Sequence, residues 1–339
     1  MTKNKIAYSI LELAIVSEGA TLQDTFEHSL ALAQAAENVG YKRFWLAEHH
    51  NSVAIGSSAT AILIGKIAEG TKKIRVGSGG IMLPNHSPLI IAEQFGTLGT
   101  LYPNRIDLGL GRAPGTDQLT AQAIRSDFFQ AAQSFPLEVE KIERYFSAEN
   151  ADSKVRATMA EGVSVPLYIL GSSTDSAHLA AKKGLPYAFA SHFATTHLMN
   201  ALQIYHQEFQ PSLKLERPYT AAGVNIIVAD TDEEAERIST SLYKMIIGLL
   251  TGNRGFMQPP VDMTDDLREL TKNPSVQQML KYSFIGSKET VKNQVLQFIS
   301  DTQVDELIAV TNIYDGQDRI KSYQLFAEIM IELNEARSL

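Results

Sequence analysis

A glutamate and two histidines stand side by side in the run Glu48-His49-His50. Histidine changes its charge near neutral pH, so the pair has the chemistry needed for general acid or base catalysis, or for orienting a reacting group. A histidine also commonly packs in a core or caps a loop, and that structural role stays open for each of the two. Because the run directly follows the strand-like segment 43–47, we expect it at a strand end.

Metal binding is a rival interpretation of the same histidines. Ligands on one strand usually have i, i+2 spacing, because successive side chains point to opposite faces, whereas His49 and His50 are adjacent. His86 and His192 offer further nitrogen ligands from other strand ends, but no carboxylate stands at a spacing that supports a preformed site. We therefore expect no metal.

Two consecutive glycines occur in the run Ser78-Gly79-Gly80, after the third strand-like segment. Glycine adopts backbone torsion angles closed to other residues and lets a flat ligand approach the main chain. An ordinary loop also uses such pairs, so the glycines alone do not define a site.

Phosphate-binding groups follow the next two predicted strands. Arg112 stands in a glycine-rich turn, and its guanidinium suits either a phosphate or a surface carboxylate. The run Gly171-Ser172-Ser173 opens a predicted helix, where free N–H groups and hydroxyls bind anions or simply cap the helix. Neither a Walker loop nor a GxGxxG turn is present. A flavin or deazaflavin, pyridoxal phosphate or a sugar phosphate remains, and no placed strand end carries the lysine that pyridoxal phosphate needs.

The elements that carry these residues alternate between short apolar strands and longer segments with helical spacing. The predicted strands are 6–13, 43–47, 74–76, 106–110, 166–170, 187–190, 222–229 and 307–310. Eight such units predict an α/β fold of the TIM (β/α)8 barrel type, as a single domain over 1–339. A doubly wound open sheet with fewer strands is the alternative. Residues 250–283 are predicted to be a mobile loop insertion between units seven and eight.

Composition narrows the classes of partner. Lys and Arg number 30 against 38 Asp and Glu, and the net charge of −8 opposes binding to a nucleic acid. Without cysteine, the chain has no disulfide, thiolate metal site or cysteine nucleophile. No secretory signal and no apolar run of about 18 residues is apparent, so we expect no membrane partner and a cytoplasmic location.

Four stretches of the chain are similar to a known family: 44–50, 76–84, 104–112 and 184–186. On these residues the chain resembles the bacterial luciferase-like flavin monooxygenases over nearly its whole length. The resemblance implies a TIM barrel that binds reduced FMN, supplied by a separate flavin reductase. The FMN would react with O2 through a C4a-hydroperoxide and oxidise a small or medium organic substrate.

The resemblance also implies roles for individual residues. His49 matches the family's catalytic histidine, with Glu48 beside it, and a non-proline cis peptide is expected within Ser78-Gly79-Gly80 to support the flavin ring. The expected cofactor-binding residues are Ala47, Ser78, Gly79, Gly80, Arg112, Gly171, Ser172, Ser173 and Ser176. The substrate pocket is expected to draw on Leu11, Glu12, His192, Phe193 and the insertion.

Two departures from the family pattern bear on activity. Gly111 stands where the light-emitting subunit has a cysteine, and Ser172 stands where that subunit has an acidic residue. The expectation is therefore a non-luminous monooxygenase, and the resemblance implies a homodimer or a higher homo-oligomer. Two alternatives stay open: an oxidoreductase of the same superfamily that uses F420, and a flavin-binding protein without turnover.

Overall fold

Parallel strands close into a barrel in the computed structural model, which describes residues 5–338. The strands of the closed barrel are β1 (Ala7–Glu12), β2 (Arg43–Leu46), β3 (Arg75–Met82), β4 (Ile106–Gly111), β5 (Leu167–Gly171), β6 (Tyr187–Phe189), β7 (Thr220–Ala229) and β9 (Glu306–Val310). They follow the order β1 to β7 and then β9, which pairs again with β1. The predicted TIM barrel is thus confirmed, and the open sheet is excluded.

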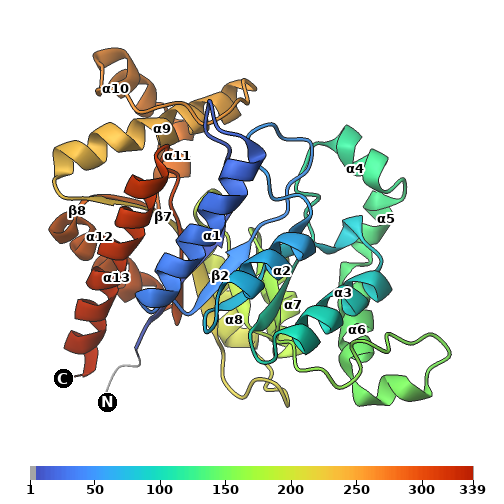
Figure 1. The fold of residues 1–339 in the computed structure, drawn as a ribbon. Helices are drawn as coiled ribbons and strands as arrows, with labels where there is room; N and C mark the ends of the chain where they lie inside the picture. The colour runs from blue at the N-terminus through green and yellow to red at the C-terminus, as the bar shows by residue number, and fades with distance from the viewer. Residues whose placement is uncertain (1–4, 339) are drawn as a thin grey trace.

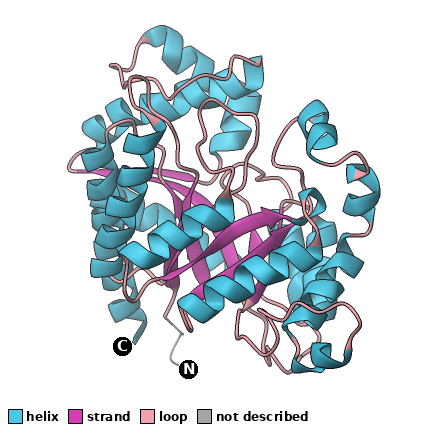
Figure 2. Cartoon of the chain, turned by 45° about the vertical axis from the view of Figure 1, so that its right-hand side comes forward, coloured by secondary structure: helices cyan, strands magenta, loops and turns pink. Residues whose placement is uncertain are grey.

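Helices surround this barrel on the outside, as Figures 1 and 2 show. They are α1 (Leu22–Asn38), α2 (Thr60–Gly70), α3 (Pro88–Leu101), α4 (Gln118–Ile124), α5 (Phe128–Gln133), α6 (Phe135–Phe146), α7 (Thr174–Lys183), α8 (Leu198–Glu208), α9 (Asp232–Thr251), α10 (Asp265–Thr271), α11 (Pro274–Leu280), α12 (Lys288–Thr302) and α13 (Gly316–Ser338), with short 3-10 turns at η1 (Leu83–Asn85) and η2 (Ala148–Asp152). The main apolar core lies between strands and helices. Within residues 5–338, no helix has the length and apolar character needed to span a membrane.

A ninth strand, β8 (Ser283–Ser287), lies outside the closed barrel and was not predicted. Among residues 5–338 it pairs only with residues 225–229 of β7, while the first half of the long β7 pairs with β6 and β9. Its sequence is five residues long with a serine at each end, so it carries too little apolar signal to be recognised as a strand. The insertion between units seven and eight therefore continues through β8 and α12.

The segment 250–283 also differs from the loop expected from its sequence, because it contains α10 and α11. Figure 1 shows α10 and α11 near α9, at the end of the molecule opposite to the two chain termini. Met257 exchanges backbone hydrogen bonds with Val16 and Glu18, in the loop after β1. On the other side, Thr195 in the loop after β6 donates to the carbonyl of Gln278 at 2.8 Å. The insertion thus connects two loops that lie at the carboxyl ends of separate strands.

Charged residues fill the other end of the barrel interior, where the strands begin. Arg43 at the start of β2 donates from Nη1 to Asp107 and from Nε to Glu306, each at 2.7 Å, and all three side chains are fully buried. The hydroxyl of Tyr168 accepts a further bond from Arg43. Above this layer the interior is apolar and includes Leu11 and Trp45. A paired and hydrogen-bonded charge layer closes the floor below the site.

Candidate functional site

The predicted site residues lie at the ends of several strands of one closed barrel. Glu48 and His49 follow β2, Arg112 follows β4, and His192 follows β6. Because the strands are parallel, their carboxyl ends meet at the same end of the barrel, where the catalytic groups of such barrels are found. The fold therefore brings together residues that are far apart in the sequence.

The Glu48 carboxylate is buried and accepts four hydrogen bonds. Nε2 of His50 and Nε2 of His86 each donate to Oε1 at 2.9 Å, Nδ2 of Asn85 donates to it at 3.0 Å, and the N–H of Met82 donates to Oε2 at 2.9 Å. These donors outweigh burial and lower the pKa of Glu48 to about 2. Glu48 is thus an ionised anchor that ties the loop after β2 to the end of β3.

His49 is held differently from its neighbour. Its Nδ1 lies 3.1 Å from the carbonyl oxygen of Gly115, which only accepts, so Nδ1 carries the proton and Nε2 keeps a lone pair. Burial lowers the pKa of His49, so the ring is neutral at neutral pH. Gly115 has φ +65°, and a Cβ there would lie 2.4 Å from the Glu48 carbonyl oxygen. Only glycine lets the loop after β4 approach His49 so closely.

His192 reaches the same end of the barrel from β6. Its Nδ1 is buried and has no hydrogen-bond partner among the residues that the structure describes. Burial, aided by the nearby His49, lowers the pKa of His192 to about 3. Phe193 beside it is half exposed, and its ring meets the imidazole edge-on with centroids 4.9 Å apart.

Gly79 and Gly80 are joined by a cis peptide bond, as expected for this position. The strand prediction was too short here, because β3 continues through both glycines to Met82, with a register shift between Ser78 and Ile81. A Cβ on Gly79 would lie 2.7 Å from Leu11 and 3.0 Å from Trp45, and one on Gly80 would lie 2.8 Å from the Gly109 carbonyl oxygen. The close packing at positions 79 and 80 therefore requires residues without a side chain.

The Ser78 hydroxyl has a structural role. It donates to the carbonyl of Gly109 at 2.9 Å and accepts from the N–H of the same residue at 3.0 Å. Ala47 is similarly buried, with its carbonyl accepting from Ser57 and Thr60. The Ser78 hydroxyl and the Ala47 carbonyl are therefore already engaged within the protein, and a ligand would contact other atoms of these two residues.

Arg112 and the start of α7 lie together, as the sequence suggested. Nη2 of Arg112 is 3.1 Å from a carboxylate oxygen of Asp175, in the first turn of α7. Ser173 occupies the N-cap position, yet its side chain makes no capping hydrogen bond in the described part of the chain. The start of α7 thus offers a hydroxyl and N–H groups of the kind that bind anions, and Arg112 reaches the same helix turn through Asp175.

Other residues predicted for this corner are already engaged. The Ser176 hydroxyl donates to the Ser173 carbonyl at 2.7 Å and lies 3.0 Å from the Tyr187 hydroxyl. Gly171 makes room for it, since a Cβ there would be 1.8 Å from Ser176 Oγ. Ser172 is exposed.

Glu12 does not line a pocket with its carboxylate. Arg319 forms an ion pair with it, Ser29 donates to Oε1 at 2.9 Å, and the N–H of Ala14 donates to the same atom at 2.9 Å. Leu11, also expected in the pocket wall, is buried beside Gly79.

Sequence reasoning missed Gly115, Gly223, Asn85 and Asp175. Gly115 and Gly223 must be glycine because another loop packs against each of them, and the sequence alone does not show this packing. Asn85 joins two loops, donating to Glu48 and to the carbonyl of Pro114 at 2.9 Å. Asp175 had a readable signal, because an acidic residue in the first turn of a helix lies close to any anion bound there.

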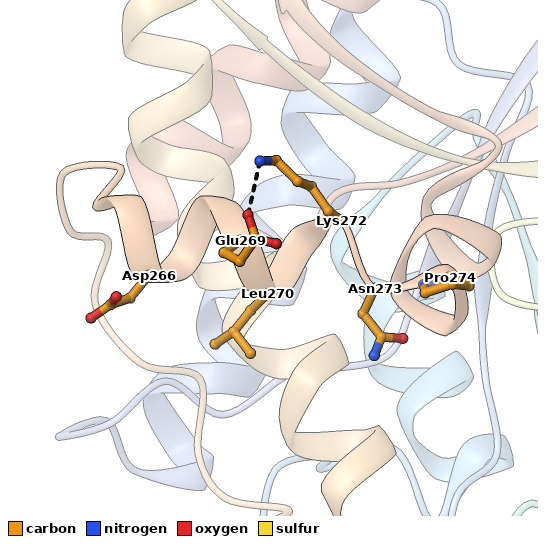
Figure 3. A pocket seen from close by; sticks show the side chains of 6 residues that line it. All are labelled: Asp266, Glu269, Leu270, Lys272, Asn273 and Pro274. Atoms are coloured by element: carbon orange, nitrogen blue, oxygen red, sulfur yellow. Dashed lines mark hydrogen bonds and ion pairs between the residues drawn. The ribbon is translucent and has the colours of Figure 1, made fainter.

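A separate hollow lies on the insertion. Figure 3 shows it between α10 and α11, lined by Asp266, Glu269, Leu270, Lys272, Asn273 and Pro274. Its lining includes an exposed ion pair, with Lys272 and Glu269 2.8 Å apart, and none of the predicted site residues. It is therefore distinct from the site at the strand ends.

The fold and the strand-end site together define a TIM barrel whose polar residues gather at the carboxyl ends of its strands, and the comparisons give the family. The chain belongs to the luciferase-like monooxygenase family, whose model matches residues 10–306. It is 48% identical over 322 residues to YvbT of Bacillus subtilis (strain 168), covering 95% of this chain and 96% of that protein. It is 45% identical over 333 residues to a luciferase-like monooxygenase of Escherichia coli (strain K12), covering 98% and 99%.

Solved structures support the same family. Apo-MsnO8 has a TM-score of 0.88 at 33% identity and covers 97% of this chain and 99% of its own. Two structures at 16% identity share the fold: an FMN complex of the oxygenating constituent of 3,6-diketocamphane monooxygenase from Pseudomonas putida, and an F420-dependent secondary alcohol dehydrogenase. Their TM-scores are 0.72 and 0.70; the first covers 96% of this chain and 97% of its own, the second 95% and 98%.

Proposed function

We propose that this protein is an FMN-dependent, non-luminous monooxygenase that uses reduced FMN and O2 to oxidise a small or medium organic substrate. The observation that carries the proposal is the arrangement of bare glycine backbone, a neutral imidazole and a guanidinium on the ends of β2, β3 and β4. The bare backbone accommodates a flat tricyclic ring, the neutral imidazole accepts a proton, and the guanidinium binds a phosphate.

The residues fit a flavin. The peptide between Gly79 and Gly80 offers a surface without side chains, bordered by Leu11 and Trp45, on which a flat ring packs. The uncapped start of α7 and Arg112 offer N–H groups, a hydroxyl and a positive charge to a terminal phosphate.

Reduced FMN supplies two electrons, which place one atom of O2 in the substrate and release the other as water. The protein's own part is to position groups and to manage protons. The Nε2 lone pair of His49 accepts a proton, and the bond from Nδ1 to Gly115 fixes the ring orientation. Glu48 keeps its charge and holds the loop that presents His49, so it acts as a positioning residue.

Two alternatives differ in measurable ways. The longer acidic tail of F420 calls for extra positive charge, whereas Asp175 places negative charge beside Arg112, which disfavours F420 more strongly than FMN. Titration of the protein with FMN, F420 and riboflavin, followed by absorbance, should give the tightest binding for FMN. Tighter F420 binding would reverse the cofactor assignment.

A storage protein is distinguished by chemistry. The reduced FMN complex is mixed rapidly with air-saturated buffer and candidate substrates, and oxygenated product is measured by mass spectrometry. Product formation supports a monooxygenase, and flavin oxidation without any product supports storage.

The proposal includes a separate flavin reductase, a cytoplasmic location and a homodimer or higher homo-oligomer. Light scattering tests the oligomeric state.

A further inference from the structure

The His192 ring rests directly on the backbone of β7. A Cβ added to Gly223 would lie 2.5 Å from Nδ1 of His192, so the missing side chain creates the space for the ring. Nδ2 of Asn225 donates to the His192 carbonyl at 2.7 Å, and Ser191 donates to the Gly223 carbonyl at 2.7 Å. The ring is therefore held against β7 by its neighbours.

This packing selects one neutral form of the imidazole. A Cβ replaces one of the two hydrogens on a glycine Cα, so a Cα–H of Gly223 points toward Nδ1. A lone pair on Nδ1 accepts this weak contact from the Cα–H. A proton on Nδ1 would instead clash with the Cα–H of Gly223 and would be buried without an acceptor. Burial also keeps the ring uncharged, because it lowers the pKa of His192. Nε2 therefore carries the proton.

His49 has the opposite polarity. Its Nδ1–H is engaged by the Gly115 carbonyl, which leaves Nε2 as an acceptor. The two histidines follow β2 and β6, which are four strands apart around the barrel in either direction. Two imidazoles of opposite polarity, one with Nε2 as an acceptor and one with Nε2 as a donor, thus follow opposite strands at the same end of the barrel.

The position of His192 indicates which ligand meets the donor. Gly79 and Gly80 belong to β3, and β3 is four strands from β7 in either direction around the closed barrel. A flavin ring packed on the glycine pair presents its other face toward β7, where His192 lies. The organic substrate must occupy the space between them.

We propose that His192 is a specificity-determining residue that donates a hydrogen bond from Nε2 to an oxygen atom of the organic substrate. The enzyme then selects molecules with a carbonyl or carboxamide oxygen over hydrocarbons of the same shape. This inference rests on the proposed function for its substrate, but its statement about the His192 ring does not.

The first test reads the imidazole itself. The protein is labelled with 15N-histidine, and two-bond 15N–1H couplings identify the protonated nitrogen of each ring; the signal lost in His192→Gln identifies His192 among the eight histidines. A proton on Nε2, unchanged from pH 5 to pH 8, is the expected result. A proton on Nδ1, or a charged ring at pH 6, overturns the proposal without reference to any cofactor.

The second test compares two probes of one shape, cyclohexanone and methylenecyclohexane, on the FMN-loaded protein by calorimetry. One neutral hydrogen bond predicts a preference of about fivefold for the ketone. His192→Gln places an amide N–H near the position of Nε2 and should keep the preference, while His192→Asn reaches only as far as Nδ1 and should lose it. Equal binding of the probes, no binding of either, or an unchanged preference in His192→Asn overturns the proposal.

Failure of this inference is separable from failure of the proposed function. FMN titration of the same three proteins tests the cofactor, because the His192 ring is assigned to the substrate. If the wild-type protein does not bind FMN, the proposed function is contradicted, while the 15N result on the His192 ring is unaffected. Normal FMN binding with equal probe affinities would contradict the role of His192 alone.

Discussion

The Arg112 guanidinium and the Asp175 carboxylate are 3.1 Å apart, and this ion pair joins the loop after β4 to the first turn of α7. Both side chains are largely exposed, at 49% and 67%, so the pair contributes little to stability. A phosphate bound at the start of α7 would compete with Asp175 for the same guanidinium. Asp175 should therefore weaken the binding of FMN rather than support it.

Replacing Asp175 with asparagine should tighten FMN binding. An exposed pair is worth up to about 1 kcal/mol, so the dissociation constant should fall by about two- to fivefold. Flavin absorbance titration measures it, and riboflavin, which lacks the phosphate, is the control ligand. An equal gain for riboflavin would mean that Asp175 acts on the ring and not on the phosphate.

Replacing His49 with alanine should slow the chemistry and spare the cofactor. Removal of a proton acceptor costs about 10²–10⁴-fold in the rate of the step it assists. The dissociation constant of FMN should change by less than about threefold, since one contact of the imidazole with Gly115 is all that the loop loses. Single-turnover mixing of the reduced complex with oxygen gives the rate, and an unchanged rate would remove His49 from the mechanism.

The positions of the main site residues could be predicted because they follow strands in the sequence. His49, Arg112 and Ser173 each stand within a few residues of a strand, and parallel strands deliver such residues to one end of a barrel. The cis peptide at Gly79 was expected for its family position. The order of residues along the chain thus predicted where the site residues lie, and the family resemblance predicted the cis peptide.

What could not be predicted depends on contacts between loops. Glu48 was expected in a catalytic role, but His86 and Met82 from the next unit engage its carboxylate, and nothing in the run Glu48-His49-His50 indicates this. Gly223 has a purpose only because a ring from the loop after β6 packs on it. Strand β8 forms because the long β7 leaves its second half unpaired by the barrel.

The charge layer on the barrel floor should respond strongly to loss of one member. In Arg43→Met the carboxylates of Asp107 and Glu306 lose a buried partner, and this should cost about 3–5 kcal/mol of unfolding free energy. Urea denaturation followed by circular dichroism measures it. Lys272→Ala, which breaks an exposed pair with Glu269, is the matched control and should change stability by less than about 0.5 kcal/mol. Equal effects of the two variants would contradict the buried character of the layer.

Stability should decline in mild acid because of His192. Its pKa is about 3 in the folded protein and about 6.5 when unfolded, so below pH 6.5 the unfolded chain binds a proton that the folded chain does not. The stability is fully present above pH 6.5 and is lost as the pH falls toward 3, with a slope that approaches about 1.4 kcal/mol per pH unit. Glu48, with its pKa lowered to about 2, stabilises the folded protein above about pH 4.5 and adds to the loss of stability only below that pH.

The window from pH 6 to pH 4.5 covers the protonation of histidines in the unfolded chain, and comparison with His192→Gln separates His192 from the other titrating groups. Urea denaturation of both proteins at several pH values should give a wild-type slope that is steeper by about 1 kcal/mol per pH unit, since His49 and the other groups titrate in both. A variant that is less stable at every pH but has the same slope would show that the glutamine packs poorly and that His192 is already charged in the folded protein. A shallower variant slope would show that the ring stays neutral on Gly223, as its donor role requires.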